Sequence, residues 1–168
     1  MSLAATLNAL DDRAAREALG RCCGASRWVE GMVARRPFAS DDAVHQAADA
    51  VWASATEADV LEALSHHPEI GADIDALRAK FASTAGWSEG EQAGVGAASD
   101  EVLIALRDGN RRYRERFGHI FVVCASGKSA EEMLALLRAR SDNDPADELR
   151  IAAEEQRKIT HLRLDKLA

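Results

Sequence analysis

Helix-start signals recur along the whole 168-residue chain, and they constrain its fold more than any other feature. Each signal is a Ser, Thr or Asp followed by apolar residues spaced three or four apart, which is the pattern of a capped amphipathic helix. Such starts stand at Asp11, Ser26, Ser40, Thr56, Ser88, Asp100 and Ser129. A proline at position 145 suits the first turn of a long final helix. The pattern predicts an all-α protein.

Glycine and proline separate the expected helices. The predicted helices cover roughly 11–19, 26–33, 40–52, 56–65, 74–81, 100–116, 129–140 and 145–167, and a short one follows Ser88. The only strand-like run is Ile120–Ala125, which is short and has no evident pairing partner, so we expect a buried extended segment rather than a sheet. We predict a single domain over residues 1–168, with seven to nine helices and this one extended segment.

Charge and apolar content argue against two classes of partner. The net charge of −7 gives no field that would attract nucleic acid or an anionic membrane. A local run of arginines at 111, 112, 114 and 116 is interleaved with Glu115 and reads as a solvated helix face. No apolar run approaches the roughly 20 residues of a membrane span. We therefore expect neither a nucleic-acid partner nor a membrane partner.

The ends of the chain and its cysteines suggest a cytoplasmic protein. Residues 1–10 lack the basic start and apolar core of a signal peptide, and the C-terminus lacks the S-K-L peroxisomal tripeptide. The three cysteines, Cys22, Cys23 and Cys124, do not suggest a disulfide framework. Cys124 lies in an apolar run, where a buried small hydrophobe is the default interpretation.

The histidines do not form a metal motif, but one of them occupies a notable position. None of the five belongs to a helical H-E-x-x-H arrangement, so no metal is expected. In Ser65–Gly71, Pro68 fixes the backbone at a predicted helix end and holds His67 at a rigid corner. The alternative is structural, with the ring of His67 bonded to the last carbonyls of the preceding helix.

Two further segments have both a structural and a functional interpretation. Ser88 and Glu91 have capping-box spacing and could only satisfy each other's backbone amides. The same helix start could instead offer N–H groups to an anion, with Glu91 and Gln92 facing a polar ligand. The backbone groups of the 120–125 segment need partners, which a ligand rich in amides, a neighbouring helix or water could supply.

Together these segments resemble the 2-oxo-4-hydroxy-4-carboxy-5-ureidoimidazoline (OHCU) decarboxylases. The motifs, in order, are His67-Pro68-Glu69-Ile70-Gly71, Ser88-x-x-Glu91-Gln92 and the run Asn110-x-x-Tyr113-Arg114-Glu115-Arg116-Phe117-Gly118-x-x-Phe121-Val122. The similarity begins at Leu7-Asn8-Ala9-Leu10 and ends at Ile159-Thr160-His161-Leu162-Arg163-Leu164. Each motif is weak alone, and their order and spacing make the resemblance specific.

The resemblance implies an all-helical homodimer that decarboxylates OHCU to (S)-allantoin during urate degradation, without a cofactor. It implies His67 as the catalytic histidine. We expect Glu91, in the matching substrate-binding stretch, to be a second catalytic group that orients or polarises His67 or holds the substrate's hydroxyl group. The substrate-binding residues that it implies are Pro68, Ser88, Glu89, Gly90, Glu91, Gln92, Phe121, Val122, Val123, Cys124, Ala125 and Arg163. It leaves open an association with the upstream hydroxyisourate hydrolase, and a non-catalytic ureide-binding subunit is the alternative function.

Three stretches depart from the family pattern. His119 and Ile120 stand where the family usually has an aromatic residue and a proline, and His161 stands where it often has arginine. The stretch Cys22–Gly24 replaces an aromatic residue, an acid and a histidine. These departures bear on the shape of the pocket more than on the reaction.

Overall fold

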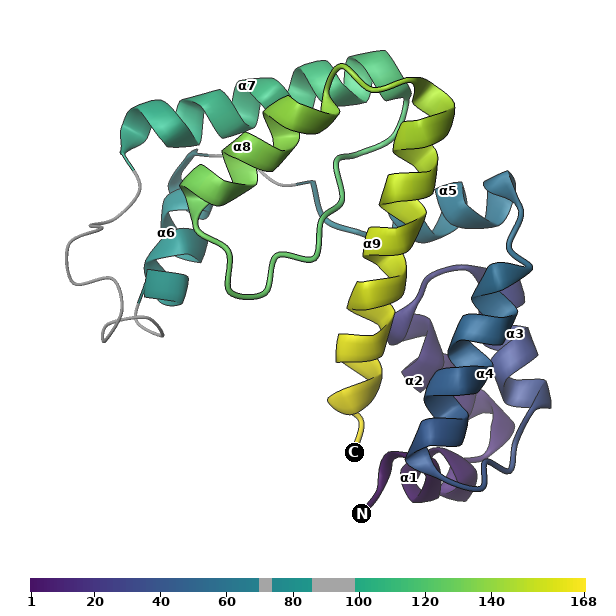
Figure 1. Ribbon diagram of the computed structural model, residues 1–168. Helices are drawn as coiled ribbons and strands as arrows, with labels where there is room; N and C mark the ends of the chain where they lie inside the picture. The colour runs from purple at the N-terminus through teal and green to yellow at the C-terminus, as the bar shows by residue number, and fades with distance from the viewer. Residues whose placement is uncertain (70–73, 86–98) are drawn as a thin grey trace. The chain divides into compact units, whose positions relative to one another are not determined.

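The computed structural model describes residues 1–69, 74–85 and 99–168, and this part of the chain is helical without a strand (Figure 1). Its nine helices are α1 (Leu3–Ala9), α2 (Asp12–Cys22), α3 (Ser26–Ala34), α4 (Asp41–Ala53), α5 (Glu57–Ser65), α6 (Ile74–Ala85), α7 (Asp100–Phe117), α8 (Ala130–Arg140) and α9 (Pro145–Asp165). The predicted all-α class is confirmed. None of the described helices is long and apolar enough to cross a membrane.

Most of the predicted helix starts are confirmed by side-chain caps. Asp11, Ser40 and Ser129 each accept a hydrogen bond from a backbone N–H in the first turn of their helix. Thr56 and Asp59 form a reciprocal capping box at the start of α5. These bonds satisfy backbone donors that a helix cannot pair internally, which is why such starts are readable from local sequence.

Helices α1, α2 and α3 differ from the expectation. The sequence pattern did not predict α1, because seven residues are too few to show a clear helical spacing of apolar residues. Burial of Leu3 and Leu7 stabilises this helix. Helix α2 continues past the predicted break at Gly20 to the buried Cys22. Ser26 does not cap α3, because its backbone N–H and its hydroxyl both donate to the Glu62 carboxylate, at 2.5 and 3.0 Å.

The contacts divide the chain into two units, so the single domain stays a prediction. The first unit comprises Met1–His67 and Ala153–Ala168, and the second comprises Pro68–Ala152. In the first unit, α1 to α5 and the C-terminal part of α9 supply the core, which includes Leu7, Leu19, Trp28, Met32 and Leu164. The Trp52 indole donates to the Ala153 carbonyl at 3.0 Å.

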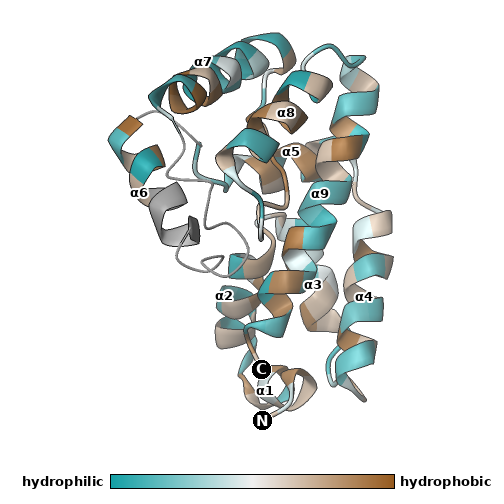
Figure 2. Ribbon diagram, turned by 60° about the vertical axis from the view of Figure 1, so that its left-hand side comes forward, coloured by the Kyte–Doolittle hydropathy of each residue, from teal (hydrophilic) through white to brown (hydrophobic). Residues whose placement is uncertain are grey.

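The second unit is built on α7. Helix α8 packs along α7, and α6 also contacts α7 (Figure 1). Gly109 permits the close approach of α8, because a Cβ at that position would lie 2.7 Å from Cδ2 of Leu137. The core of this unit includes Leu103, Leu106, Tyr113, Met133 and Leu137. Hydrophobic and hydrophilic residues alternate along the helices, as amphipathic packing requires (Figure 2).

Candidate active site

His67 lies at the corner that follows α5, in the first unit. Helix α5 ends in a tightened turn, in which the amides of His66 and His67 bond to the carbonyls of Ala63 and Leu64 at 3.2 Å each. The His67 ring does not turn back to these carbonyls. Its Nε2 lies 2.5 Å from Oε1 of Gln156 on α9. The structural alternative, in which the ring bonds to the end of its own helix, is wrong.

Burial makes the ring of His67 a weak base. Loss of solvent lowers the pKa of His67 below its ordinary value, and the bond to Gln156 opposes this lowering only partly. Electrostatic repulsion from the Arg163 guanidinium lowers the pKa further, as does the His66 ring in its protonated form. The neutral form of the His67 ring is therefore favoured.

The partner of His67 belongs to a buried polar chain that the sequence analysis missed. Gln156 has no exposed surface, and its amide nitrogen donates to Oγ1 of Thr160 at 3.0 Å. The Thr160 hydroxyl donates in turn to the main-chain carbonyl of Gln156 at 2.9 Å. Gln156 and Thr160 are four residues apart on one helix face, and this spacing is the signal that could have pointed to them.

The departing stretch Cys22–Gly24 is part of this corner. A Cβ at Gly24 would lie 2.5 Å from ring atoms of His66, so glycine leaves room for the residue that precedes His67. Cys23 lies near Thr160, and burial raises the pKa of the Cys23 thiol to about 11. The stretch thus packs around the histidine corner and supplies no ionised group to it.

Arg163 supplies positive charge near His67 in the first unit. It is half-buried near the end of α9, and its Nη1 donates to the Arg21 carbonyl at 3.3 Å. Within the described ranges, no carboxylate forms an ion pair with Arg163. The structure therefore brings two of the predicted site residues, His67 and Arg163, into one electrostatic environment. An anionic group would find a guanidinium there with unused donors.

The predicted extended segment lies in the second unit, and cationic side chains bond to two of its carbonyls. Phe121, Val122 and Val123 are buried, whereas Cys124 and Ala125 are half-buried, so Cys124 is less buried than expected. Nη1 of Arg140 donates to the Val122 carbonyl at 2.8 Å. Lys128 Nζ donates to the Cys124 carbonyl at 2.6 Å. These side chains hold the segment in place of strand pairing.

A buried ion pair anchors Arg140 under this segment. Nε of Arg140 donates to the fully buried carboxylate of Glu148 at 2.8 Å. The same carboxylate accepts from Asn143 Nδ2 at 3.0 Å and from the Tyr113 hydroxyl. Burial and the Glu148 charge raise the pKa of Tyr113. The Arg140 guanidinium also lies 4.5 Å from the centre of the Phe121 ring, which joins the ion pair to the segment.

The departure at His119 has a packing explanation. Its ring lies 5.6 Å from the Tyr113 ring in an edge-on contact and stacks near Phe117 at 6.0 Å. His119 thus fills the place of an aromatic residue in the second unit. Pro68 begins this unit, and the neighbouring Glu69 pairs with Arg114 at 2.9 Å. The predicted residues Ser88, Glu89, Gly90, Glu91 and Gln92 lie outside the described residues.

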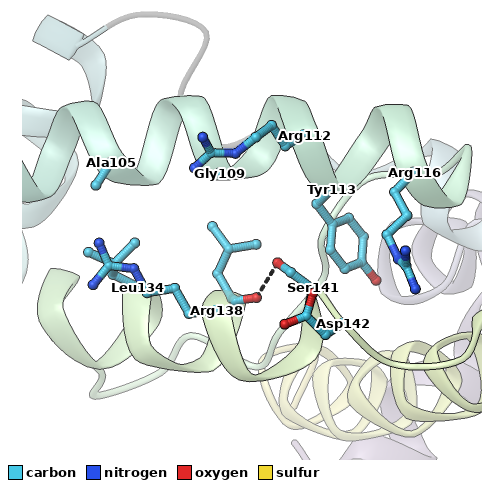
Figure 3. Close-up of a pocket in the computed structure, with 10 residues that line it drawn as sticks. Ala105, Gly109, Arg112, Tyr113, Arg116, Leu134, Arg138, Ser141 and Asp142 are labelled. Atoms are coloured by element: carbon cyan, nitrogen blue, oxygen red, sulfur yellow. Dashed lines mark hydrogen bonds between the residues drawn. The ribbon is translucent and has the colours of Figure 1, made fainter.

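The second unit also contains a pocket of about 410 Å³ between α7 and α8. Its lining includes Arg112 and Arg116 from α7 and Arg138 from α8 (Figure 3). None of the predicted site residues lines it. Two of its lining residues, Tyr113 and Arg116, belong to the third motif, but neither is among the predicted catalytic or substrate-binding residues.

Comparison with known proteins gives a consistent result. A model of the OHCU decarboxylase family matches residues 8–165. The uric acid degradation bifunctional protein TTL of Arabidopsis thaliana is 40% identical over 148 residues, which are 87% of this chain and 45% of that protein. The chain thus spans less than half of this plant relative.

Two other matches extend over most of both chains. The 2-oxo-4-hydroxy-4-carboxy-5-ureidoimidazoline decarboxylase of Haloferax volcanii is 30% identical over 161 residues, which are 94% of this chain and 91% of that protein. A crystal structure of an OHCU decarboxylase, obtained in the presence of (S)-allantoin, is 36% identical with a TM-score of 0.73 and covers 94% of this chain and 98% of that one. Because the family model spans nearly the whole sequence and the fold agrees, this chain belongs to the OHCU decarboxylase family.

Proposed function

We propose that the protein decarboxylates OHCU to (S)-allantoin in urate degradation. The observation that carries the proposal is a half-buried histidine with a lowered pKa, at the position of the family's catalytic histidine and near an arginine with unused donors. Such an arrangement offers one group that can exchange protons and one that can orient an anion.

The proposed reaction needs no cofactor, because the substrate itself can accept the electron pair that decarboxylation leaves. OHCU has a carboxylate and a hydroxyl group on one ring carbon, beside a C=N bond. When CO₂ leaves, the C=N system accepts the electron pair, so the substrate supplies the electron sink that cofactors provide elsewhere. The protein has to orient the carboxylate, exclude competing proton sources and deliver a proton to one face of the ring.

A neutral imidazole suits this proton work. The ring nitrogen of the former C=N bond takes up one proton from solvent. His67 accepts the hydroxyl proton as the ring carbonyl forms, and it returns a proton to the carbon that bears the ureido group, which sets the (S) configuration. Arg163 pairs with the substrate carboxylate or another polar edge. In the same proposal, Glu91 is the second catalytic group. Gln92 and the backbone of residues 121–125 form hydrogen bonds with the amide groups of the substrate. Pro68 and Ser88–Gly90 are the remaining substrate-binding residues.

The cellular setting is part of the same proposal. We propose a cytoplasmic homodimer with one substrate site per subunit. Because OHCU is unstable, association with the hydrolase that produces it would limit its loss. Analytical ultracentrifugation, with and without that hydrolase, measures both associations.

The direct test follows OHCU as it forms from urate. The protein should speed the decay of the intermediate's absorbance and yield allantoin with the circular dichroism of the (S) enantiomer. A protein that binds the ureide but leaves the decay rate and optical activity unchanged would be the non-catalytic binding subunit instead.

Arg163→Lys should raise KM about tenfold at a similar melting temperature, because lysine keeps the charge but loses the planar two-pronged donor. The half-buried position and the single bond to the Arg21 carbonyl leave few structural contacts to lose. The control is Arg150→Lys, an exposed position on the same helix, which should leave KM unchanged. An unchanged KM in Arg163→Lys would make Arg163 a structural residue.

Glu91→Gln separates the two roles that the sequence allows for this residue. A capping box accepts Gln as well as Glu at the third helical position, so a purely capping Glu91 predicts full turnover. If Glu91 acts on His67 or the substrate as a carboxylate, kcat should fall about 10²-fold or more at an unchanged melting temperature. We expect the second outcome. Measurement of kcat and of the melting temperature for this variant and the wild type distinguishes the two roles.

A further inference from the structure

We infer that Gln156, oriented by Thr160, is a positioning residue that fixes the tautomer of His67. In this arrangement Nε2 keeps its hydrogen, and Nδ1 is the nitrogen that exchanges protons with the substrate. The inference deepens the proposed function and rests on it for the catalytic consequence, whereas the tautomer can be tested without any activity.

The direction of the hydrogen bonds follows from a count of donors. A threonine hydroxyl has one hydrogen, and that of Thr160 is used on the main-chain carbonyl of Gln156. The side-chain contact from Gln156 to Thr160 Oγ1, at 3.0 Å, must therefore come from the amide nitrogen. This places the amide oxygen toward His67. An amide oxygen can only accept, so Nε2 of His67 must donate.

Burial makes this preference strong. Gln156 is fully buried, and its oxygen lies 2.5 Å from Nε2. The other neutral tautomer would place two lone pairs against each other in a site with little solvent, and it would leave a buried oxygen unsatisfied. Nδ1 makes no hydrogen bond within the described ranges. The network thus holds one nitrogen and leaves the other unprotonated.

The charges around His67 explain why an amide occupies this place rather than a carboxylate. Arg163 and His66 are the charged or titratable neighbours that act on the ring, and each disfavours the imidazolium form. The thiol of Cys23, which lies near Thr160, stays protonated because burial raises its pKa to about 11. A glutamate at 156 would stabilise the imidazolium, whereas glutamine orients the ring and leaves it neutral.

The test combines nitrogen NMR with kinetics on three variants. Side-chain ¹⁵N shifts of His67, assigned by their loss in His67→Asn, report which ring nitrogen bears the hydrogen. Gln156→Met keeps the length of the side chain and removes the acceptor. Gln156→Glu replaces the amide with a carboxylate, and Thr160→Val removes the hydroxyl that orients the amide. Gln46→Met, at an exposed position on α4, is the control.

In the wild type, His67 should be the Nε2–H tautomer. Gln156→Met should mix the tautomers and lower kcat about 10- to 100-fold, the range for lost orienting partners, at a similar KM. Thr160→Val should lower kcat less. In Gln156→Glu, the acid limb of the kcat profile should move up by about one pH unit or more, because the carboxylate favours the protonated ring. Gln46→Met should match the wild type.

An Nδ1–H tautomer in the wild type would overturn the inference, as would an unchanged tautomer and kcat in Gln156→Met. If Gln156→Met does not fold, the ¹⁵N shifts of His67 in the wild type and the kcat of Thr160→Val still test the inference. If the wild type has the Nε2–H tautomer but does not decarboxylate OHCU, the proposed function fails and the assignment of the tautomer stands.

Discussion

His67→Asn is expected to lower kcat about 10²- to 10⁴-fold, the range that one positioned acid or base contributes. Asparagine is polar and can occupy part of the space beside Gln156, but it cannot exchange a proton near neutral pH. The fold should persist, because the helix-end bonds at this corner come from the backbone amides of His66 and His67. Steady-state kinetics with a thermal melt measures both effects.

The matched control is His66→Asn. This neighbouring ring is exposed and packs over Gly24, and it bonds to no member of the Gln156 network. Its replacement should leave kcat within a few-fold of the wild type. Equal losses from the two variants would contradict the assignment of His67 and would point to a general disturbance of the corner.

Arg140→Met is expected to lower the free energy of unfolding by about 3–5 kcal/mol, the usual cost of removing one partner from a buried ion pair. The fully buried Glu148 would keep only Asn143 and Tyr113 as partners, and the Val122 carbonyl would lose its donor. For a chain of this length, the melting temperature should fall by roughly 10 °C. Urea unfolding of the variant and wild type gives the difference directly.

The control for Arg140 stands two residues earlier on the same helix. Arg138 is exposed, so Arg138→Met should change stability by no more than about 0.5 kcal/mol. Adding Glu148→Gln to Arg140→Met should recover part of the loss, because it removes the uncompensated buried charge. Equal melting temperatures for Arg138→Met and Arg140→Met would show that the ion pair does not stabilise the second unit.

Local sequence predicted the helices because helix starts are local events. The caps at Asp11, Ser40, Thr56 and Ser129 join groups three residues apart, and the structure confirms each of them. Local sequence did not predict the hydrogen bonds of a helix start where a residue distant in the chain supplied the partner. Ser26 reads as a cap, but Glu62, which is 36 residues away, accepts both its hydroxyl and its amide.

The candidate site divides in the same way. The corner of His67 and Pro68 could be predicted, because a helix end followed by proline is a short-range signal. The extended segment at 120–125 could be predicted as buried, but not its dependence on Arg140, which reaches Val122 from 18 residues away. His119 reads as a departure in sequence and proves to fill an aromatic position by packing.

By itself the sequence determined the all-α class, most helix starts, the family and the position of His67. Only the tertiary structure decided the protonation of that histidine, because its partner Gln156 is 89 residues away and acts through burial and a hydrogen bond. A pKa and a tautomer depend on the solvent, charges and donors that surround a ring. Those surroundings exist only after folding brings distant residues together, so a local sequence pattern cannot predict them.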